Sequence, residues 1–280
     1  MSMFNNRRLL IATKHSKEIV IAPLLEKELG VSCFVSSNFD TDVLGTFTGD
    51  IERQQTPLET VRAKCLKAME LHNCDLGVAS EGSFGAHPSL YFIPGDDELV
   101  MLIDLKNNLE IVGRALSTST NFNGTLIYTK QALLDFATQA KFPSHGLILK
   151  NDATPFLQVY KGITDETSLL HCFNNLLDTY QQAYVETDMR AMYNPTRMEV
   201  IKQATEDLLQ KIKSVCPSCN TPGYWITNAT KGLPCSWCGM PTKGILSNIY
   251  ECKSCLYTSE KMYPYGKEYE DPGYCDYCNP

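Results

Sequence analysis

The hydrophobic residues of the first 215 positions alternate between two spacings, the two-residue period of β-strands and the 3.6-residue period of α-helices. Short apolar runs bounded by polar turn residues predict strands, and apolar residues that recur every three or four positions predict helices. Strands and helices that alternate in this way predict an α/β domain. The predicted strands cover residues 8–13, 31–36, 75–80, 89–93, 98–105, 109–116, 146–150, 156–161 and 183–187. The predicted helices cover residues 17–29, 56–72, 130–141, 165–181 and 196–213.

Local sequence signals locate some of the boundaries between these elements. Thr56 is the predicted N-cap of the second helix, Pro57 takes its first helical position, and Glu59 completes a capping box. The polar and glycine-containing segment 81–88 (EGSFGAHP) follows a buried strand and is predicted to form a loop. Helical periodicity ends near Ser214, so we expect an α/β domain over 1–214 and a small module over 215–280.

The composition describes a globular chain with an acidic charge balance. Of its 280 residues, 43% are hydrophobic, and 25 Lys and Arg stand against 32 Asp and Glu for a net charge of −7. Residues 216–280 contain five Lys, no Arg and six acids. No part has the basic surface that a phosphate backbone requires, which disfavours nucleic-acid partners. The sequence shows neither a secretory signal nor roughly 20 consecutive apolar residues, so we expect no membrane association and a cytoplasmic location.

Eight of the twelve cysteines lie in four Cys-x-x-Cys pairs near the end of the chain. Two such pairs complete a tetrahedral four-sulfur site, so four pairs predict two structural zinc ions, with iron as the less expected metal. Pairing in sequence order predicts a double zinc ribbon, over 216–238 and 252–278. Interleaved pairing, as in a cross-brace, would use the same residues differently. The predicted ligands are Cys216, Cys219, Cys235, Cys238, Cys252, Cys255, Cys275 and Cys278.

Both tryptophans and eight of the fourteen tyrosines also lie within residues 216–280. They would supply either the core of a small metal-stabilised module or a docking surface for a protein partner. The near-neutral charge favours these roles over base stacking on single-stranded nucleic acid. The other four cysteines have no ligand spacing and are expected to be small buried hydrophobic residues: Cys33, Cys65, Cys74 and Cys172.

Polar residues gather at predicted strand ends, where open α/β sheets place ligands. Lysines and hydroxyls at a strand-to-helix turn suit phosphate groups, and carboxylates beside them would hold magnesium or manganese and orient a water molecule. Glu81 stands between a buried strand and a glycine, where a charge without a function would be costly. The candidate catalytic residues are Glu59 and Glu81. The candidate phosphate- and nucleotide-binding residues are Thr13, Lys14, His15, Lys17, Lys64, Ser83, Arg190 and Arg197.

Several of these residues have a plain structural alternative. Glu59 would only cap its helix, and Lys64 would lie on a solvated helix face. The two arginines would form ion pairs with nearby acids in a purely structural network. The residues of that network would be Glu186, Asp188, Arg190 and Arg197.

The order of these motifs resembles that of the inosine/xanthosine triphosphate pyrophosphatases and the Maf-type nucleotide pyrophosphatases. In that family the first strand ends in T-x-N-x-x-K. Here Thr13 matches and Lys17 comes one residue early. The second helix of the family reads T-x-x-E-N-A-x-x-K-A, and Thr56, Glu59 and Lys64 match that frame.

Further along, the family has a strand that ends in Asp-Asp-Ser-Gly, and this chain has Ala79-Ser80-Glu81-Gly82 at that point, with one carboxylate in place of two. Arg190 stands in place of the family's Ser-His-Arg. The resemblance covers roughly residues 8–200. It implies a Maf-like mixed-sheet domain with a long central cleft.

The resemblance also implies magnesium-dependent cleavage of a nucleoside triphosphate to a monophosphate and pyrophosphate. In that scheme Lys17, Lys64 and Arg190 would hold phosphates. Glu59 and Glu81 would hold the metal. The whole chain also resembles an uncharacterised bacterial family of unknown function with C-terminal zinc ribbons, which adds no activity. The alternative is a non-catalytic nucleotide-binding protein that docks a protein partner through its zinc ribbons.

Overall fold

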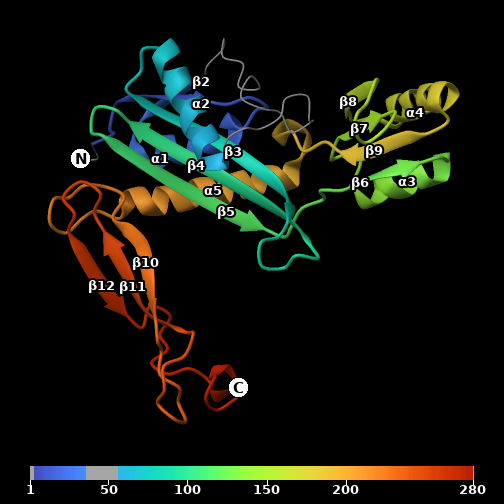
Figure 1. Ribbon diagram of the computed structural model, residues 1–280. Coiled ribbons are helices and arrows are strands. Elements are labelled where there is room, and N and C mark those ends of the chain that lie inside the picture. The colour runs from blue at the N-terminus through green and yellow to red at the C-terminus, as the bar shows by residue number, and fades with distance from the viewer. Residues whose placement is uncertain (1–2, 36–55, 280) are drawn as a thin grey trace. The chain divides into compact units, whose positions relative to one another are not determined.

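The computed structural model describes residues 3–35 and 56–279, which form two compact units, Met1–Leu209 and Gln210–Pro280. Helix α5 (Pro195–Lys213) runs across the division between the units. That division follows Leu209, a few residues before the predicted boundary near Ser214. In the part of the chain that is described, no helix is both long and apolar enough to cross a membrane. The structure is a mixed α/β fold with three sheets, two in the first unit and one in the second (Figure 1).

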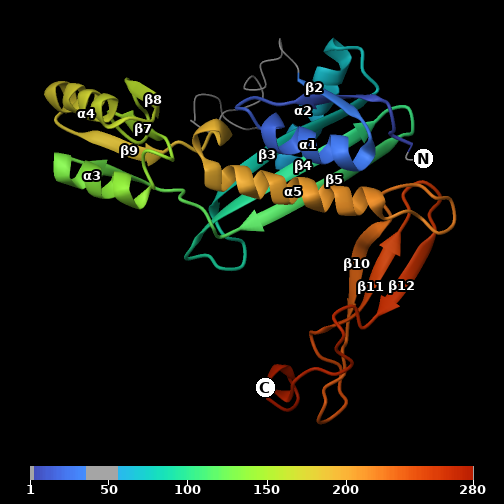
Figure 2. The same ribbon diagram turned by 180° about the vertical axis from the view of Figure 1, so that it is seen from behind.

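The larger sheet of the first unit has the strand order β2-β1-β3-β4-β5. Strand β1 runs parallel to both of its neighbours, whereas β3, β4 and β5 form an antiparallel meander. Helix α2 covers one face of this sheet (Figure 1), and α1 and α5 cover the other (Figure 2). The bounds are β1 Arg8–Ala12, α1 Glu18–Leu29, β2 Ser32–Val35, α2 Pro57–Leu71, β3 Leu76–Ala86, β4 Pro94–Asp104 and β5 Leu109–Ser117.

Helix α2 begins where its local chemistry predicts. The Thr56 hydroxyl accepts a hydrogen bond from the Glu59 amide, and the Glu59 carboxylate accepts one from the Thr56 amide, which confirms the capping box. On the opposite face, α5 approaches β5 closely at Gly113, where a Cβ atom would lie 2.1 Å from the Ala204 carbonyl oxygen. A residue without a side chain is therefore needed where helix and strand meet.

The second sheet of this unit has the order β6-β9-β7-β8, and all its neighbours are antiparallel. Its apolar residues pack with those of α3 and α4 into a separate hydrophobic core, which includes Leu133, Leu149, Phe173 and Val185. The bounds are β6 Gly124–Ile127, α3 Lys130–Gln139, β7 Leu147–Lys150, β8 Val159–Ile163, α4 Glu166–Tyr180 and β9 Ala183–Thr187.

Two local predictions were wrong. Residues 81–86 belong to β3 rather than to a loop, because β3 pairs with β4 over its whole length, from Leu76 opposite Asp104 to Ala86 opposite Pro94. The alternating run at 89–93 forms the turn that joins these two strands. Strand β3 is thus long enough to continue past its pairing with β1, which ends at Ala79.

The second unit is built on a three-stranded antiparallel sheet with the order β10-β11-β12. One Cys-x-x-Cys turn precedes β10, and the next two follow β10 and β11. Its described hydrophobic core is small and consists of Cys216, Cys252, Tyr224 and the partly buried Tyr250. Since a core of this size stabilises little, a bound metal would be a main source of stability. The strand bounds are β10 Trp225–Lys231, β11 Ile245–Glu251 and β12 Thr258–Met262.

Candidate functional sites

The eight paired cysteines form two groups of four in the second unit, and in each group the sulfur atoms lie within 4.8 Å of one another. Each group could hold one metal ion, which is consistent with two zinc sites. The grouping is interleaved, so the prediction of two sequential ribbons over 216–238 and 252–278 was wrong. The first group is Cys216, Cys219, Cys252 and Cys255, and the second is Cys235, Cys238, Cys275 and Cys278.

The interleaving follows from the direction of the strands. Strand β10 carries the chain away from the first cysteine pair over seven residues, a distance of about 23 Å at ~3.3 Å per residue. Strand β11 runs back antiparallel, with Glu251 opposite Trp225, and so brings the third pair beside the first. Strand β12 then leads away again, toward the end at which the second and fourth pairs meet.

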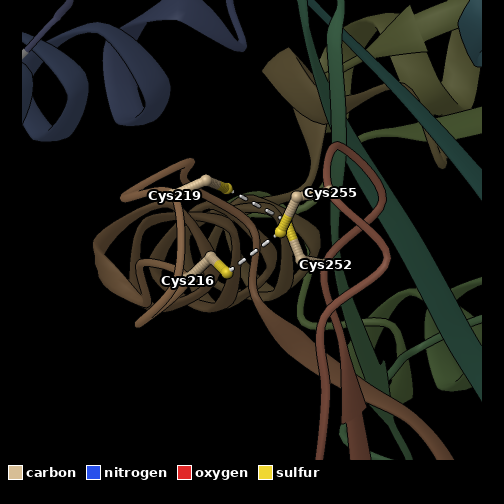
Figure 3. A group of neighbouring side chains, drawn as sticks. All are labelled: Cys216, Cys219, Cys252 and Cys255. Atoms are coloured by element: carbon tan, nitrogen blue, oxygen red, sulfur yellow. Dashed lines mark hydrogen bonds between the residues drawn. The ribbon is translucent and has the colours of Figure 1, made fainter.

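The sulfur positions match a tetrahedral site. In the first group, Cys216 lies 3.7 Å from Cys255 and Cys219 lies 3.6 Å from Cys252, measured between sulfur atoms, and the four side chains point toward one centre (Figure 3). The corresponding distances in the second group are 3.8 Å and 3.7 Å. A zinc–sulfur bond of about 2.3 Å places the corners of a tetrahedron about 3.8 Å apart.

Backbone donors prepare these thiols for a metal. The amide of Ser218 donates to Cys216 Sγ and that of Trp237 to Cys235 Sγ, both at 3.4 Å. The amide of Cys238, helped by that of Trp237 and opposed by burial, lowers the pKa of the Cys235 thiol to about 7. Thiolates are the metal-binding form, so the turn at Cys235 favours coordination. In the same group, the hydrogen bond with the Cys238 thiol raises the pKa of Cys278 to about 12. Of the four cysteines outside these turns, Cys65 is buried as expected, whereas Cys33, Cys74 and Cys172 are only partly buried.

A second feature lies along strands β3 and β4 of the large sheet, where six charged side chains are buried together. We call this set the charge cluster. It combines three cations with three carboxylates, each no more than 7% exposed. Charged groups are seldom buried in such number without a binding role. The members are Lys17, Lys64, Glu81, Asp96, Glu98 and Arg197.

Strand alternation divides the charge cluster between the two faces of the sheet. Glu81 points toward α2 and forms an ion pair with Lys64. Glu98 points to the opposite face, where Arg197 of α5 donates from Nε to its Oε1 at 2.6 Å. The Lys17 ammonium, at the start of α1, donates to the Ser80 hydroxyl at 3.1 Å.

Gly82 makes room for the ion pair between Glu98 and Arg197. It lies opposite Glu98 in the register of β3 and β4. A Cβ atom at this position would lie 2.2 Å from Glu98 Oε1 and 2.8 Å from Arg197 Nη2. The Arg197 guanidinium also donates to the Met189 carbonyl and lies over the Phe84 ring, 5.0 Å from its centroid.

Asp96 is the least satisfied member of the charge cluster. Its side chain is fully buried, and neither of its oxygens has a hydrogen-bond partner among the described residues. Burial, and then the charge of Glu98, raise the pKa of Asp96 to about 8 against the opposing effect of nearby Arg197 and Lys17. Burial also lowers the pKa of Lys17 to about 8.

A cavity of about 980 Å³ lies next to the charge cluster, between the two sheets of the first unit. Phe84 lies between the charge cluster and the cavity. Its ring lies beneath Arg197 and also lines the cavity, where it stacks on Phe122. Ser83 and Arg190 are the sequence-predicted residues on the cavity wall. The acids Glu186 and Asp188 line it as well.

The remaining sequence candidates lie elsewhere. Glu59 is exposed, and its carboxylate bonds to the Thr56 amide and hydroxyl, as the structural alternative predicted. Thr13 is buried and donates to the Lys14 carbonyl, and His15 occupies a left-handed turn with φ 67°.

The ion-pair network that was the structural alternative for the two arginines is found for Arg190 only. Arg190 pairs with Asp188, whereas Arg197 pairs with Glu98. Lys64 is buried rather than on a solvated helix face.

Sequence reasoning missed Asp96 and Glu98. The strand was expected to begin at 98, which left Asp96 outside it. The available signal was the spacing of the two acids, which places both on the same face of a continuing strand.

The interleaved grouping predicts how many metal ions each cysteine variant retains. A Cys216→Ser/Cys252→Ser protein should lose one zinc ion, because both changes fall in the same group. A Cys216→Ser/Cys235→Ser protein should lose both, because each group loses a thiolate. Zinc per chain, measured by elemental analysis after dialysis, distinguishes the cases. Sequential pairing would give the reverse pattern.

Replacement of Gly82 should disturb the ion pair beneath it. We expect Gly82→Ala to lower the free energy of unfolding by about 1–3 kcal/mol, since the added methyl overlaps two buried charged groups. Gly85→Ala in the same strand is the matched control, because a Cβ there meets nothing within 4 Å. Equal stability of the two variants in urea unfolding would show that the space at Gly82 is not needed.

Comparisons with known proteins add a family but no activity. No curated protein matches the chain. A similar solved structure is protein VC0702 from Vibrio cholerae, with 10% sequence identity, a TM-score of 0.31, and coverage of 73% of this chain and 94% of that chain. Residues 64–280, more than half of the chain, match a family described as a domain of unknown function. The chain therefore belongs to the family DUF6671, a domain of unknown function.

Proposed function

We propose that the chain is a metal-dependent nucleotide phosphohydrolase, of the nucleoside triphosphate pyrophosphatase type, whose zinc sites are structural. The observation that carries this proposal is the burial of three cations and three carboxylates along β3 and β4 of the large sheet. The order of motifs that resembles the Maf and inosine triphosphate pyrophosphatase families supports it, since the charge cluster contains Lys17, Lys64 and Glu81 of those motifs.

Burial of this many charges points to a ligand because it is a poor source of stability. Buried ion pairs are often no better for stability than apolar side chains of the same volume. Asp96 is a stronger case, because both its oxygens lack hydrogen-bond partners in the described structure. An unpaired buried carboxylate costs several kcal/mol or takes up a proton. Such a cost is typically retained at functional sites.

The position of the charge cluster suits phosphate binding. Strand β1 ends at Ala12, and the following turn brings Lys17 against Ser80 of β3. Ligands of α/β sheets bind at the carboxyl ends of parallel strands. Lys17 and Arg197 on one face would bind phosphate oxygens. Lys64 on the other face fixes Glu81, so its part would be to position that carboxylate.

The cavity would hold the rest of the nucleotide. Its volume of about 980 Å³ is sufficient for a nucleoside. Its wall combines aromatic rings with polar groups, among them Phe84, Tyr184 and Asn123. This combination suits a heteroaromatic base, and Arg190, held by Asp188, lies on the same wall to bind a phosphate or sugar oxygen.

A magnesium or manganese ion fits the donor chemistry of the charge cluster. Carboxylate oxygens are the protein ligands that both ions prefer. The orphaned oxygens of Asp96 supply the observation that tests the fit. When bound, the cation would neutralise phosphate charge and lower the pKa of a water molecule that attacks phosphorus. Arg197 would orient the carboxylate of Glu98, and Phe84 would exclude water from one side of the site.

A second candidate is a non-catalytic nucleotide-binding protein that uses the zinc module to dock a protein partner. One observation favours it: neither predicted catalytic acid is poised for catalysis, since Glu59 caps α2 and Glu81 is paired with Lys64. This candidate predicts a nucleotide-induced rise in melting temperature without turnover. A cytoplasmic location and the absence of nucleic-acid partners remain expectations for both candidates.

The test is an assay of the zinc-loaded protein with magnesium or manganese and a panel of standard and deaminated nucleoside triphosphates, in which pyrophosphate and phosphate are measured separately. We expect pyrophosphate release, and a loss of at least about 100-fold in kcat/KM in Glu81→Gln, because the charge opposite Lys64 disappears.

Glu59→Gln is the matched control, because glutamine also completes a capping box and should leave turnover unchanged. No turnover by a folded protein that nucleotides stabilise against heat would establish the binding candidate instead. Equal turnover in the wild type and Glu81→Gln would remove Glu81 from the mechanism.

A further inference from the structure

We propose that Asp96 and Glu98 of β4 form a binding site for one divalent cation of the magnesium or manganese class. The role of the cation in hydrolysis rests on the proposed function, but its binding does not. This assignment replaces Glu59 and Glu81, the acids that the family resemblance implies, because Glu59 caps α2 and Glu81 faces Lys64 on the other side of the sheet.

The two carboxylates lie on the same face of the same strand. Residues two apart in a strand project from one face, at a separation of roughly 6.6 Å along the chain. Asp96 lies opposite Phe84 and Glu98 opposite Gly82 in the register with β3. Because Gly82 has no side chain, no group from β3 fills the space above Glu98.

Three carboxylate oxygens at this place lack a hydrogen-bond partner among the described residues. They are both oxygens of Asp96 and the Oε2 atom of Glu98, and both side chains are 0% exposed. Arg197 satisfies only Oε1 of Glu98. Buried oxygens are almost always bonded, and exceptions often mark an ion or water that belongs there. A cation between the two side chains would satisfy all three.

The donor set selects the class of cation. Asp96 and Glu98 offer only oxygen, and the described structure has no group of three or more Cys, His, Asp or Glu ligand atoms besides the two cysteine clusters. Hard cations such as magnesium and manganese prefer oxygen and keep several waters when few protein ligands are present. Zinc prefers the thiolates of the second unit. The same chain would thus bind zinc through thiolates and magnesium or manganese through carboxylates.

The charge balance explains why a cation would also recruit an anion. With both carboxylates ionised, the charge cluster has three positive and three negative groups. A divalent cation adds two positive charges at a buried position, which favours a phosphate ligand that can also complete the coordination of the metal. Lys17 and Arg197 already lie on the same face to meet that ligand.

The experiment is a titration of the zinc-loaded, full-length protein with manganese, with free manganese measured by electron paramagnetic resonance. We expect one manganese ion per chain in the wild type and at least a tenfold loss of affinity in Asp96→Asn. Asp97→Asn is the matched control: Asp97 is the next residue, its side chain points to the other face, and it pairs with the exposed Arg114. The control should bind like the wild type.

Folding is checked in the same samples. Asp96→Asn replaces a buried carboxyl group that has no hydrogen-bond partner among the described residues, so its melting temperature without manganese should equal or exceed that of the wild type. Addition of inorganic pyrophosphate should tighten manganese binding in the wild type and in Asp97→Asn only. Magnesium should displace the bound manganese.

Two results would overturn the site: no manganese binding by the wild type, or equal binding by the wild type and a folded Asp96→Asn. Manganese binding that depends on Asp96, in a protein without turnover, would keep the site and contradict the hydrolase. Unchanged turnover in an Asp96→Asn variant that has lost manganese binding would keep the site and remove its cation from the hydrolysis.

Discussion

The pairing of β3 with β4 over eleven residues is the constraint on which the first unit depends. Only Gly77–Ala79 of β3 also pair with β1, so the hairpin continues where the parallel part of the sheet has ended. There the helices on both faces bury polar positions that a shorter hairpin would leave in solvent. Glu81, Asp96 and Glu98 owe their burial to that extension, and the cations Lys17, Lys64 and Arg197 reach them from three different helices or their first turns.

In the second unit, the direction of the strands determines which cysteine pairs lie together. Each strand carries the chain from one metal group to the other, so neighbouring cysteine pairs along the sequence belong to different sites. Both sites must then form for the three strands to be held at both ends. This arrangement suits a unit with a small hydrophobic core, because metal–thiolate bonds would replace much of the burial that a larger domain would use.

The sequence predicted the features that depend on local chemistry. The capping box of α2, the alternation of helices and strands and the cysteine ligands were all visible in short segments. It failed where a long-range pairing decided the result. The polar segment 81–86 has the composition of a loop, and only its pairing with β4 makes it a strand. The grouping of Cys216 with Cys252 depends on the length and direction of β10, which cysteine spacing does not encode.

The same limit applies to the charge cluster. Lys17 and Glu81 were visible beside strand ends. Asp96 fell outside the predicted strand 98–105 and Glu98 stood at its first position, because the burial of both arises from the register of β4 with β3. In the structural alternative, Arg197 would pair with Glu186 or Asp188, which are close to it in sequence. It pairs instead with Glu98, 99 positions away, because α5 packs across the face of the sheet on which Glu98 lies. The ion-pair partner of Arg197 is thus determined by how α5 packs on the sheet rather than by the residues near it in the sequence.

The central claim is that the buried charges serve a ligand rather than the stability of the fold. Its most direct test is the stability and nucleotide response of an apolar triple variant, Asp96→Leu/Glu98→Leu/Arg197→Met. Since apolar replacement of complete buried ion pairs is often neutral or stabilising by about 1–4 kcal/mol, the variant should unfold at the same or higher urea concentration. It should also lose any rise in melting temperature with magnesium and nucleoside triphosphate. A large loss of unfolding free energy, or a nucleotide response equal to that of the wild type, would contradict the claim.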